Sequence, residues 1–227
     1  NAFVKADLIF RDWTDFFAYR VDQTTPRVTD STGLTTDVAI AENISEGVSR
    51  EYRALQFQGN WSPMLFQQRV SMGLNYTLAE LTGNDEQESS NSGTVGNSPG
   101  PIYYPEFFNY SQFQPEGYLS FDQRHRARAW VAYDLPVPEV LGRFNVSLLQ
   151  AFDSGTAYSA VGTIHLESYQ AALDPHTINY SGPPVNGTYF FSDRGAFRLD
   201  DITRTDIGLN YSRRVFGSFE VFGEAEV

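Results

Sequence analysis

Apolar and polar residues alternate with a period of two along much of this chain, most tellingly between Phe121 and Pro136. An extended strand there places one set of side chains on one face: Arg124, Arg126, Arg128, Trp130 and Ala132. The opposite face carries His125, Ala127, Ala129, Val131 and Tyr133. One face is therefore cationic and the other apolar, a division typical of a barrel wall with lipid outside and a polar lumen inside.

The same alternation predicts about seven strands, separated by polar segments rich in Gly, Pro, Ser and Asn. The predicted strands are 3–17, 50–61, 69–78, 121–136, 144–158, 201–216 and 219–227. The predicted connections are 19–49, 62–64, 81–117, 136–142, 159–200 and 217–218, with a weak strand at 37–44 inside the first.

These connections alternate between long and short. In an up-and-down barrel, that order puts the long loops at one rim and the short turns at the other, as in outer-membrane barrels. A sandwich has no reason to keep this order. The predicted fold class is therefore all-β, an antiparallel transmembrane barrel. Because the smallest single-chain barrels need about 8 strands, residues 1–227 are expected to form an incomplete barrel segment of a longer protein. We expect neither a plug nor a signal peptide within this segment.

Aromatic residues flank the short turns, where an inner aromatic girdle would lie. They are Trp61, Phe66, Tyr133, Phe144, Phe216 and Phe219. The alternative is that aromatics favour strand ends in any β protein.

Composition excludes several classes of protein. The net charge is −12 and the sequence pI is about 4.6, which argues against a nucleic-acid partner bound by phosphate neutralisation. The chain has no cysteine, so thiol catalysis and thiolate metal sites are excluded. No apolar run approaches the roughly 18 residues that a spanning helix needs, whereas strand alternation is compatible with the mean hydropathy of −0.36.

Several short motifs occur in an order that resembles the TonB-dependent outer-membrane receptors, particularly the Oar-like group. The first is Phe121-Asp122-Gln123-Arg124-His125, followed by a strand that ends in Tyr133-Asp134-Leu135-Pro136. The others lie at 50–55, 75–79, 155–158, 193–198 and 204–206. The resemblance covers most of the chain.

This resemblance implies a segment near the C-terminal end of a barrel of about 22 strands in the bacterial outer membrane. Such receptors take up a scarce small ligand through a plugged barrel, using energy delivered by TonB. The implied partners are outer-membrane lipid and lipopolysaccharide, TonB, the plug domain and an unknown small ligand. Neither a plug nor a TonB-contacting box occurs in these residues. The alternatives are a soluble or surface carbohydrate-binding module and a passive porin.

No catalytic group, cofactor or metal site is predicted, and we do not expect an enzyme. The three histidines are not spaced as metal ligands. Aromatic residues in the loops are the candidate ligand-binding residues, with packing between loops as the alternative. They are Tyr103, Tyr104, Phe107, Phe108, Tyr110, Tyr189 and Phe190.

A set of charged residues is predicted to face the lumen: Arg69, Arg124, Arg126, Arg128, Glu220 and Glu224. The arginine row has two interpretations. It could contact the plug or an anionic ligand, since guanidinium groups bind carboxylate and phosphate in forked pairs. Alternatively, it neutralises carboxylates of the same face, such as Glu220, Glu224 and Glu226.

Overall fold

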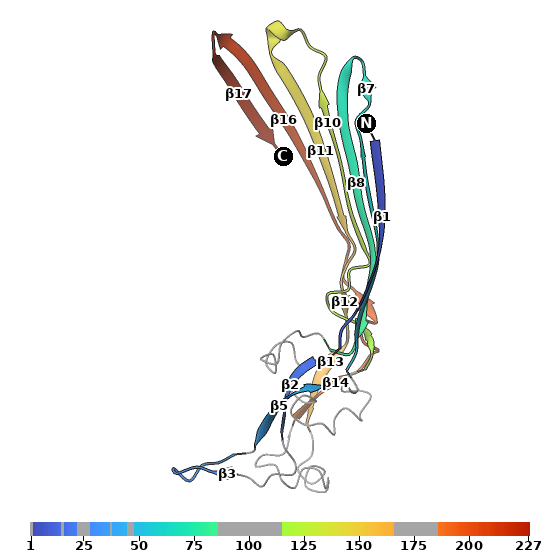
Figure 1. Cartoon of the computed structure of the whole chain (residues 1–227), viewed down its shortest axis with the longest axis vertical. Helices are drawn as coiled ribbons and strands as arrows, with labels where there is room; N and C mark the ends of the chain where they lie inside the picture. The colour runs from blue at the N-terminus through green and yellow to red at the C-terminus, as the bar shows by residue number, and fades with distance from the viewer. Residues whose placement is uncertain are drawn as a thin grey trace.

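A computed structural model of the chain describes residues 2–14, 16–21, 28–36, 38–44, 48–85, 115–165 and 186–227. Its main feature is one antiparallel sheet in which seven long strands lie side by side in chain order (Figure 1). They are β1 (Ala2–Asp12), β6 (Arg50–Trp61), β8 (Gln68–Gly83), β10 (His125–Asp134), β11 (Arg143–Asp153), β16 (Ile202–Phe216) and β17 (Phe219–Glu226). The prediction of an all-β antiparallel fold is confirmed.

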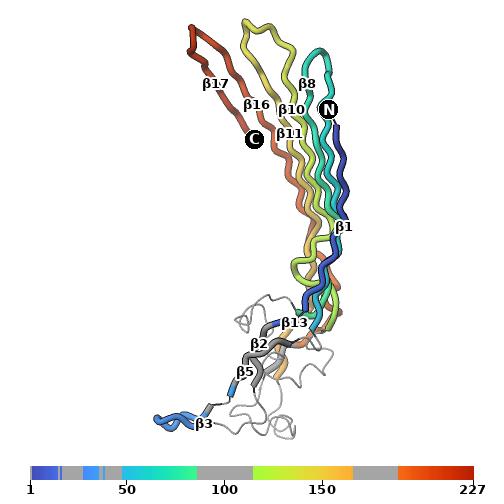
Figure 2. Tube along the Cα trace, in the orientation of Figure 1, coloured from blue at the N-terminus to red at the C-terminus, as the bar shows by residue number. Residues whose placement is uncertain are grey.

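The sheet is open. Within the described ranges, β1 and β17 each pair with one long strand only, so the sheet does not close into a barrel. The chain trace in Figure 2 shows the long strands running together as one curved layer. Two short strands, β7 (Met64–Leu65) and β9 (Gly117–Tyr118), pair with β8.

The connections differ between the two ends of the sheet, as predicted. Three tight hairpins lie at the upper end in Figure 1, and one of them contains the 3₁₀ turn η3 (Glu139–Leu141). The long connections leave from the other end, which we call the loop end. Four two-stranded sheets form there. They pair β2 (Phe16–Val21) with β5 (Ala39–Ile44), β3 (Val28–Thr29) with β4 (Thr35–Thr36), β12 (Ala157–Tyr158) with β15 (Phe197–Arg198), and β13 (Val161–His165) with β14 (Asn186–Phe190).

Several predicted boundaries were wrong. The reversal predicted at 62–64 lies at Phe66 and Gln67, both with positive φ, because β7 first extends the hairpin. The strand predicted at 3–17 ends at Asp12. The strand predicted at 121–136 begins only at His125, because the preceding residues turn to cover the sheet. The strand predicted at 144–158 ends at Asp153.

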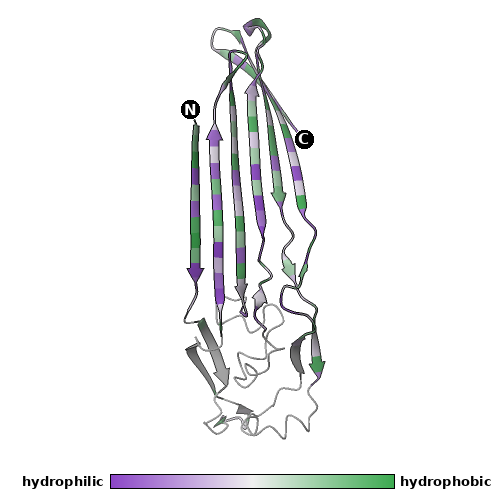
Figure 3. Ribbon diagram, turned by 90° about the vertical axis from the view of Figure 1, so that its right-hand side faces the viewer, coloured by the Kyte–Doolittle hydropathy of each residue, from purple (hydrophilic) through white to green (hydrophobic). Residues whose placement is uncertain are grey.

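Strand register gives the sheet one polar and one apolar face, visible as alternating purple and green bands in Figure 3. Directly opposite residues share a face. One such row contains Lys5, Gln58, Asn75 and Arg128, with Arg204 two strands further on. The adjacent row contains Val4, Leu74 and Ala129. The alternation used to predict the strands is therefore present in three dimensions.

The apolar face is open over much of its extent. Leu8, Leu74 and Ile207 are 70%, 47% and 52% exposed, so the described part of the chain does not cover these side chains with a second layer. Such exposure of large apolar groups on several strands of one sheet face is typical of a surface that meets a partner or an apolar medium. No helix among the described residues is both long and apolar enough to cross a membrane.

Candidate functional site

The most deeply buried side chains lie at the loop end of the sheet, where residues 119–124 fold onto β8. Leu119 and Asp122 are each only 1% exposed. The Leu81 amide donates to Asp122 Oδ1 at 2.6 Å, while Arg198 from β15 forms an ion pair with Oδ2. Arg198 Nη1 also donates to the Asp122 carbonyl oxygen at 2.8 Å. The carboxylate thus attaches a distant loop to the sheet, and we call this arrangement the junction.

Two cations lie against one aromatic ring beside this ion pair. The guanidinium carbons of Arg124 and Arg198 lie 4.9 and 5.1 Å from the centre of the Tyr118 ring. Arg124 also lies 3.5 Å from Glu80 of β8. Cation–π contacts and the ion pairs therefore tie β9, β15 and the start of β10 together.

Two glycines permit the close approach of the chain segments at the junction. A Cβ on Gly155 would lie 1.6 Å from the Leu199 carbonyl oxygen, and Gly155 N donates to Asp201 Oδ1. Gly195 has φ of 67° and its added Cβ would lie 2.5 Å from Tyr118. A larger residue at either position would separate the packed segments.

The junction brings together three of the motifs on which the receptor resemblance was based. Asp122 belongs to the first motif, Gly155 to the segment 155–158, and Arg198 to the segment 193–198. Arg198 contacts the other two directly, since its Nη1 lies 3.4 Å from the Gly155 carbonyl oxygen. The sequence pattern marked these residues without indicating that they meet.

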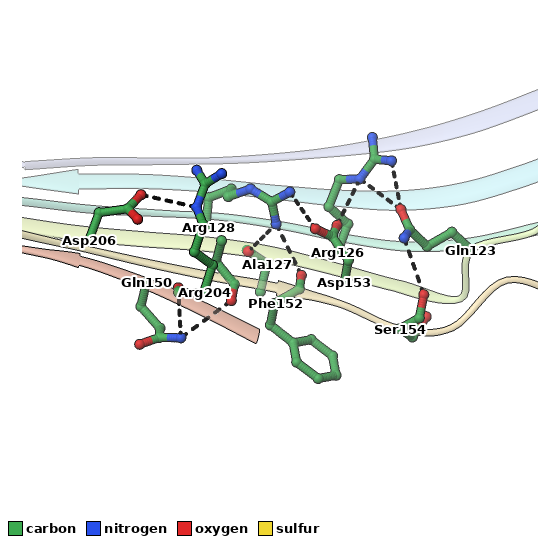
Figure 4. A network of polar contacts seen from close by, with 11 residues as sticks. Gln123, Arg126, Ala127, Arg128, Gln150, Phe152, Asp153, Ser154, Arg204 and Asp206 are labelled. Carbon is green, nitrogen blue, oxygen red and sulfur yellow. Dashed lines mark hydrogen bonds and ion pairs between the residues drawn. The ribbon is translucent and has the colours of Figure 1, made fainter. Parts of the chain in front are cut away.

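A second network of polar side chains crosses the neighbouring strands on the polar face (Figure 4). Arg128 Nη2 lies 2.6 Å from Asp153 Oδ2, and Arg126 Nε lies 3.3 Å from Asp153 Oδ1. Arg126 also donates to Gln123 Oε1 at 2.6 and 2.9 Å. Two guanidinium groups therefore share one carboxylate, which leaves a positive charge in excess at this point.

The predicted lumenal charges fall into separate places. Arg126 and Arg128 lie together, but Arg124 belongs to the junction with Glu80. By alternation along their strands, Arg69, Glu220 and Glu224 fall on the same face as Arg128, and Glu224 lies opposite Asn210. The carboxylate that pairs with Arg126 and Arg128 is that of Asp153, on the adjacent strand, and not one of the β17 glutamates named in the second interpretation of the arginine row.

The predicted loop aromatics are described only in part. Tyr103, Tyr104, Phe107, Phe108 and Tyr110 lie outside the described residues. Phe190 is 7% exposed and lies beneath the Arg194 guanidinium at 4.6 Å. The Tyr189 ring contacts Phe191, with 4.9 Å between centroids. The described structure therefore assigns Phe190 to packing within its loop.

Polar residues on the apolar face form an oblique line across the sheet. The line runs through Arg53, Glu80, His125, Gln150 and Thr205, one on each of five adjacent strands. Gln150 and Thr205 are joined by a hydrogen bond of 2.6 Å, and His125 Nδ1 lies 2.8 Å from the Tyr76 hydroxyl. On the short-turn side of this line, the face is apolar as far as Gln68 and Arg213, which lie next to the turns. On the loop side, Phe152 is an apolar exception.

Within the described ranges, no three His, Asp or Glu side chains lie close enough together to hold a metal ion. Comparison of the chain with family models, curated proteins and solved structures gave no match.

Proposed function

We propose that the sheet is part of the wall of an outer-membrane β-barrel, in a receptor that takes up a scarce ligand in the TonB-dependent manner. The single observation that carries the membrane part of this proposal is the oblique polar line on the apolar face. The division of the sheet into an open apolar face and a polar face supports it further.

The slope of the polar line matches the tilt of strands in a membrane barrel. From Arg53 to Thr205 the line shifts by six residues of register over four strand-to-strand steps. Six residues span roughly 20 Å along a strand, and four steps span roughly 19 Å across the sheet. The line therefore makes an angle of roughly 45° with the strands. A line along the membrane surface is perpendicular to the barrel axis, so the strands would tilt from that axis by the remaining angle of roughly 45°, at the upper end of the 35–45° tilt of outer-membrane barrels.

A flat apolar layer explains this slope. When tilted strands cross a bilayer, each strand leaves the hydrocarbon at a different residue, and the first polar side chain shifts steadily from strand to strand. In a soluble protein, the apolar patch follows whichever element covers it, and nothing relates its margin to strand tilt. The proposal also requires that the free edges of β1 and β17 pair with further strands, because lipid cannot satisfy their backbone groups.

The TonB-dependent part of the proposal rests on the sequence resemblance. A passive porin would share the wall without the plug, and a soluble carbohydrate-binding module would share only the strands. The membrane assignment therefore requires its own test.

Neighbouring residues on β8 provide that test. Residues 1–227 contain no cysteine, and any cysteine elsewhere in the full-length protein would first be replaced by serine. We would place single cysteines at Leu74 and Asn75 of the full-length protein, attach a fluorophore and reconstitute each variant in vesicles with quencher-bearing lipid chains. Strong quenching at Leu74 and weak quenching at Asn75 is the expected result. Equal quenching at both positions would contradict the membrane assignment.

Fractionation and TonB binding separate the remaining alternatives. The soluble module would appear in the soluble extract, and the membrane wall in the outer-membrane fraction. A full-length protein that resides in the membrane but does not bind purified TonB would favour the porin.

A further inference from the structure

A cavity of about 240 Å³ lies on the polar face, next to the junction. Its lining comes from β6, β8 and β10, together with the covering segment 121–123. The residues that matter for its chemistry are Tyr52, Gln56, Thr77, Phe121 and Arg126. Register places Gln56, Thr77 and Arg126 in one row across three adjacent strands, so their side chains project from the same face.

Three polar side chains in this cavity are available for a ligand. The Tyr52 hydroxyl, the Gln56 amide and the Thr77 hydroxyl form no hydrogen bonds with the part of the chain that the structure describes. Together they offer donors and acceptors of the kind that recognise hydroxyl groups. Tyr52 and Phe121 add aromatic surface against which a small ring can pack.

The other polar groups in the cavity already have partners. Both oxygens of Asp122 are engaged, by the Leu81 amide and by Arg198. Gln123 accepts from Arg126 and donates to the Ser154 carbonyl oxygen at 3.1 Å. These groups form part of the cavity wall. The groups that can bind a ligand are therefore those on β6, β8 and β10.

The local charge favours an anion. Arg126 shares Asp153 with Arg128, so one carboxylate serves two guanidinium groups, and the Arg126 side chain is 62% exposed. A second cation is near, because the Arg11 guanidinium lies 5.9 Å from the centre of the Tyr52 ring. A carboxylate in the cavity would therefore complete the coordination of Arg126.

We propose that this cavity binds a compact solute that carries one carboxylate and several hydroxyl groups, such as a hexuronate. The carboxylate lies against Arg126, and the hydroxyl groups bond to Gln56, Thr77 and Tyr52. This inference names a ligand class for the proposed receptor and takes its biological meaning from that function. The site itself depends only on the geometry of the polar face.

Calorimetric binding of D-glucuronate to the full-length protein in detergent tests this inference, with D-glucose as the probe that lacks the carboxylate. The native protein should bind glucuronate at least tenfold more tightly than glucose. Arg126→Gln should weaken glucuronate binding by roughly tenfold or more. Thr77→Val, which leaves the ion pairs intact, should weaken binding of glucuronate by a few-fold.

Arg204→Gln is the matched control. Arg204 lies on the same face and pairs with Asp206 at 3.1 Å, but it does not line the cavity. This variant should bind glucuronate like the native protein. Equal affinity for glucose and glucuronate, equal losses in Arg126→Gln and Arg204→Gln, or no binding by the folded native protein would each overturn the inference. Because binding is measured in detergent, its failure is distinct from failure of the lipid-quenching experiment.

Discussion

Asp122 and Arg198 form an ion pair across 76 residues of chain, and the carboxylate is fully buried. Breaking an ion pair whose carboxylate is buried destabilises a protein far more than breaking an exposed ion pair. We expect Asp122→Ala to lower the free energy of unfolding by about 3 kcal/mol, because the Leu81 amide and Arg198 both lose their acceptor. Urea titration of the refolded protein would measure this loss.

Asp206→Ala is the control for that measurement. Its partner Arg204 has a side chain that is 67% exposed, so the loss should stay within about 1 kcal/mol. Similar losses in Asp122→Ala and Asp206→Ala would show that burial does not increase the contribution of the Asp122 ion pair to the free energy of unfolding.

Gly155 is predicted to tolerate no side chain. An alanine Cβ would overlap the Leu199 carbonyl oxygen, and backbone must move to relieve the overlap. Gly155→Ala should destabilise the protein by roughly 1–3 kcal/mol. Gly223→Ala should cause no loss, because a Cβ at Gly223 meets nothing within 4 Å. Paired urea midpoints would test the difference, and equal midpoints would contradict it.

A charge on the apolar face should be costly only if that face meets lipid. Leu74→Arg is expected to destabilise the vesicle-inserted protein by about 2–4 kcal/mol, the range for arginine near the bilayer midplane. Asn75→Arg, one residue away on the polar face, should cost much less. Folding titrations in lipid vesicles would compare the two variants. A small cost for Leu74→Arg would argue against lipid contact there.

The turn of the β3–β4 hairpin should respond to acid through Asp30. Hydrogen bonds lower the pKa of this carboxyl below its usual 3.8, the largest contribution coming from the Thr32 hydroxyl, with the Leu34 and Thr32 amides adding to it. A lowered pKa means that the stabilisation is present above about pH 4 and is lost as the pH falls through the folded-state value.

Carboxyl NMR titration of Asp30 would measure this shift. In Thr32→Ala, which removes the hydroxyl donor, the pKa should move back toward its usual value. An unchanged pKa in that variant would show that the hydroxyl is not the main cause.

Sequence periodicity was sufficient to predict the main sheet. Alternation places Leu74 and Asn75 on opposite faces without any tertiary information, and the order of long and short connections predicts which strands are neighbours. The junction could not be predicted in the same way. Asp122 and Arg198 meet because two loops fold back onto the sheet, and no local period encodes that approach. The partner of the arginine row was also missed, since Asp153 ends a strand whose register was unknown.

The order of pairing has a consequence for how the sheet is built. Every long strand pairs with the long strand before it in the chain, so each short turn can close a hairpin before more distant contacts form. We therefore expect the strands to pair one hairpin at a time, starting from the tight turns. Asp122 precedes β10 and Arg198 precedes β16, so we expect their contact to form after β10, β11 and β16 have paired and then to hold the loop ends of these strands together.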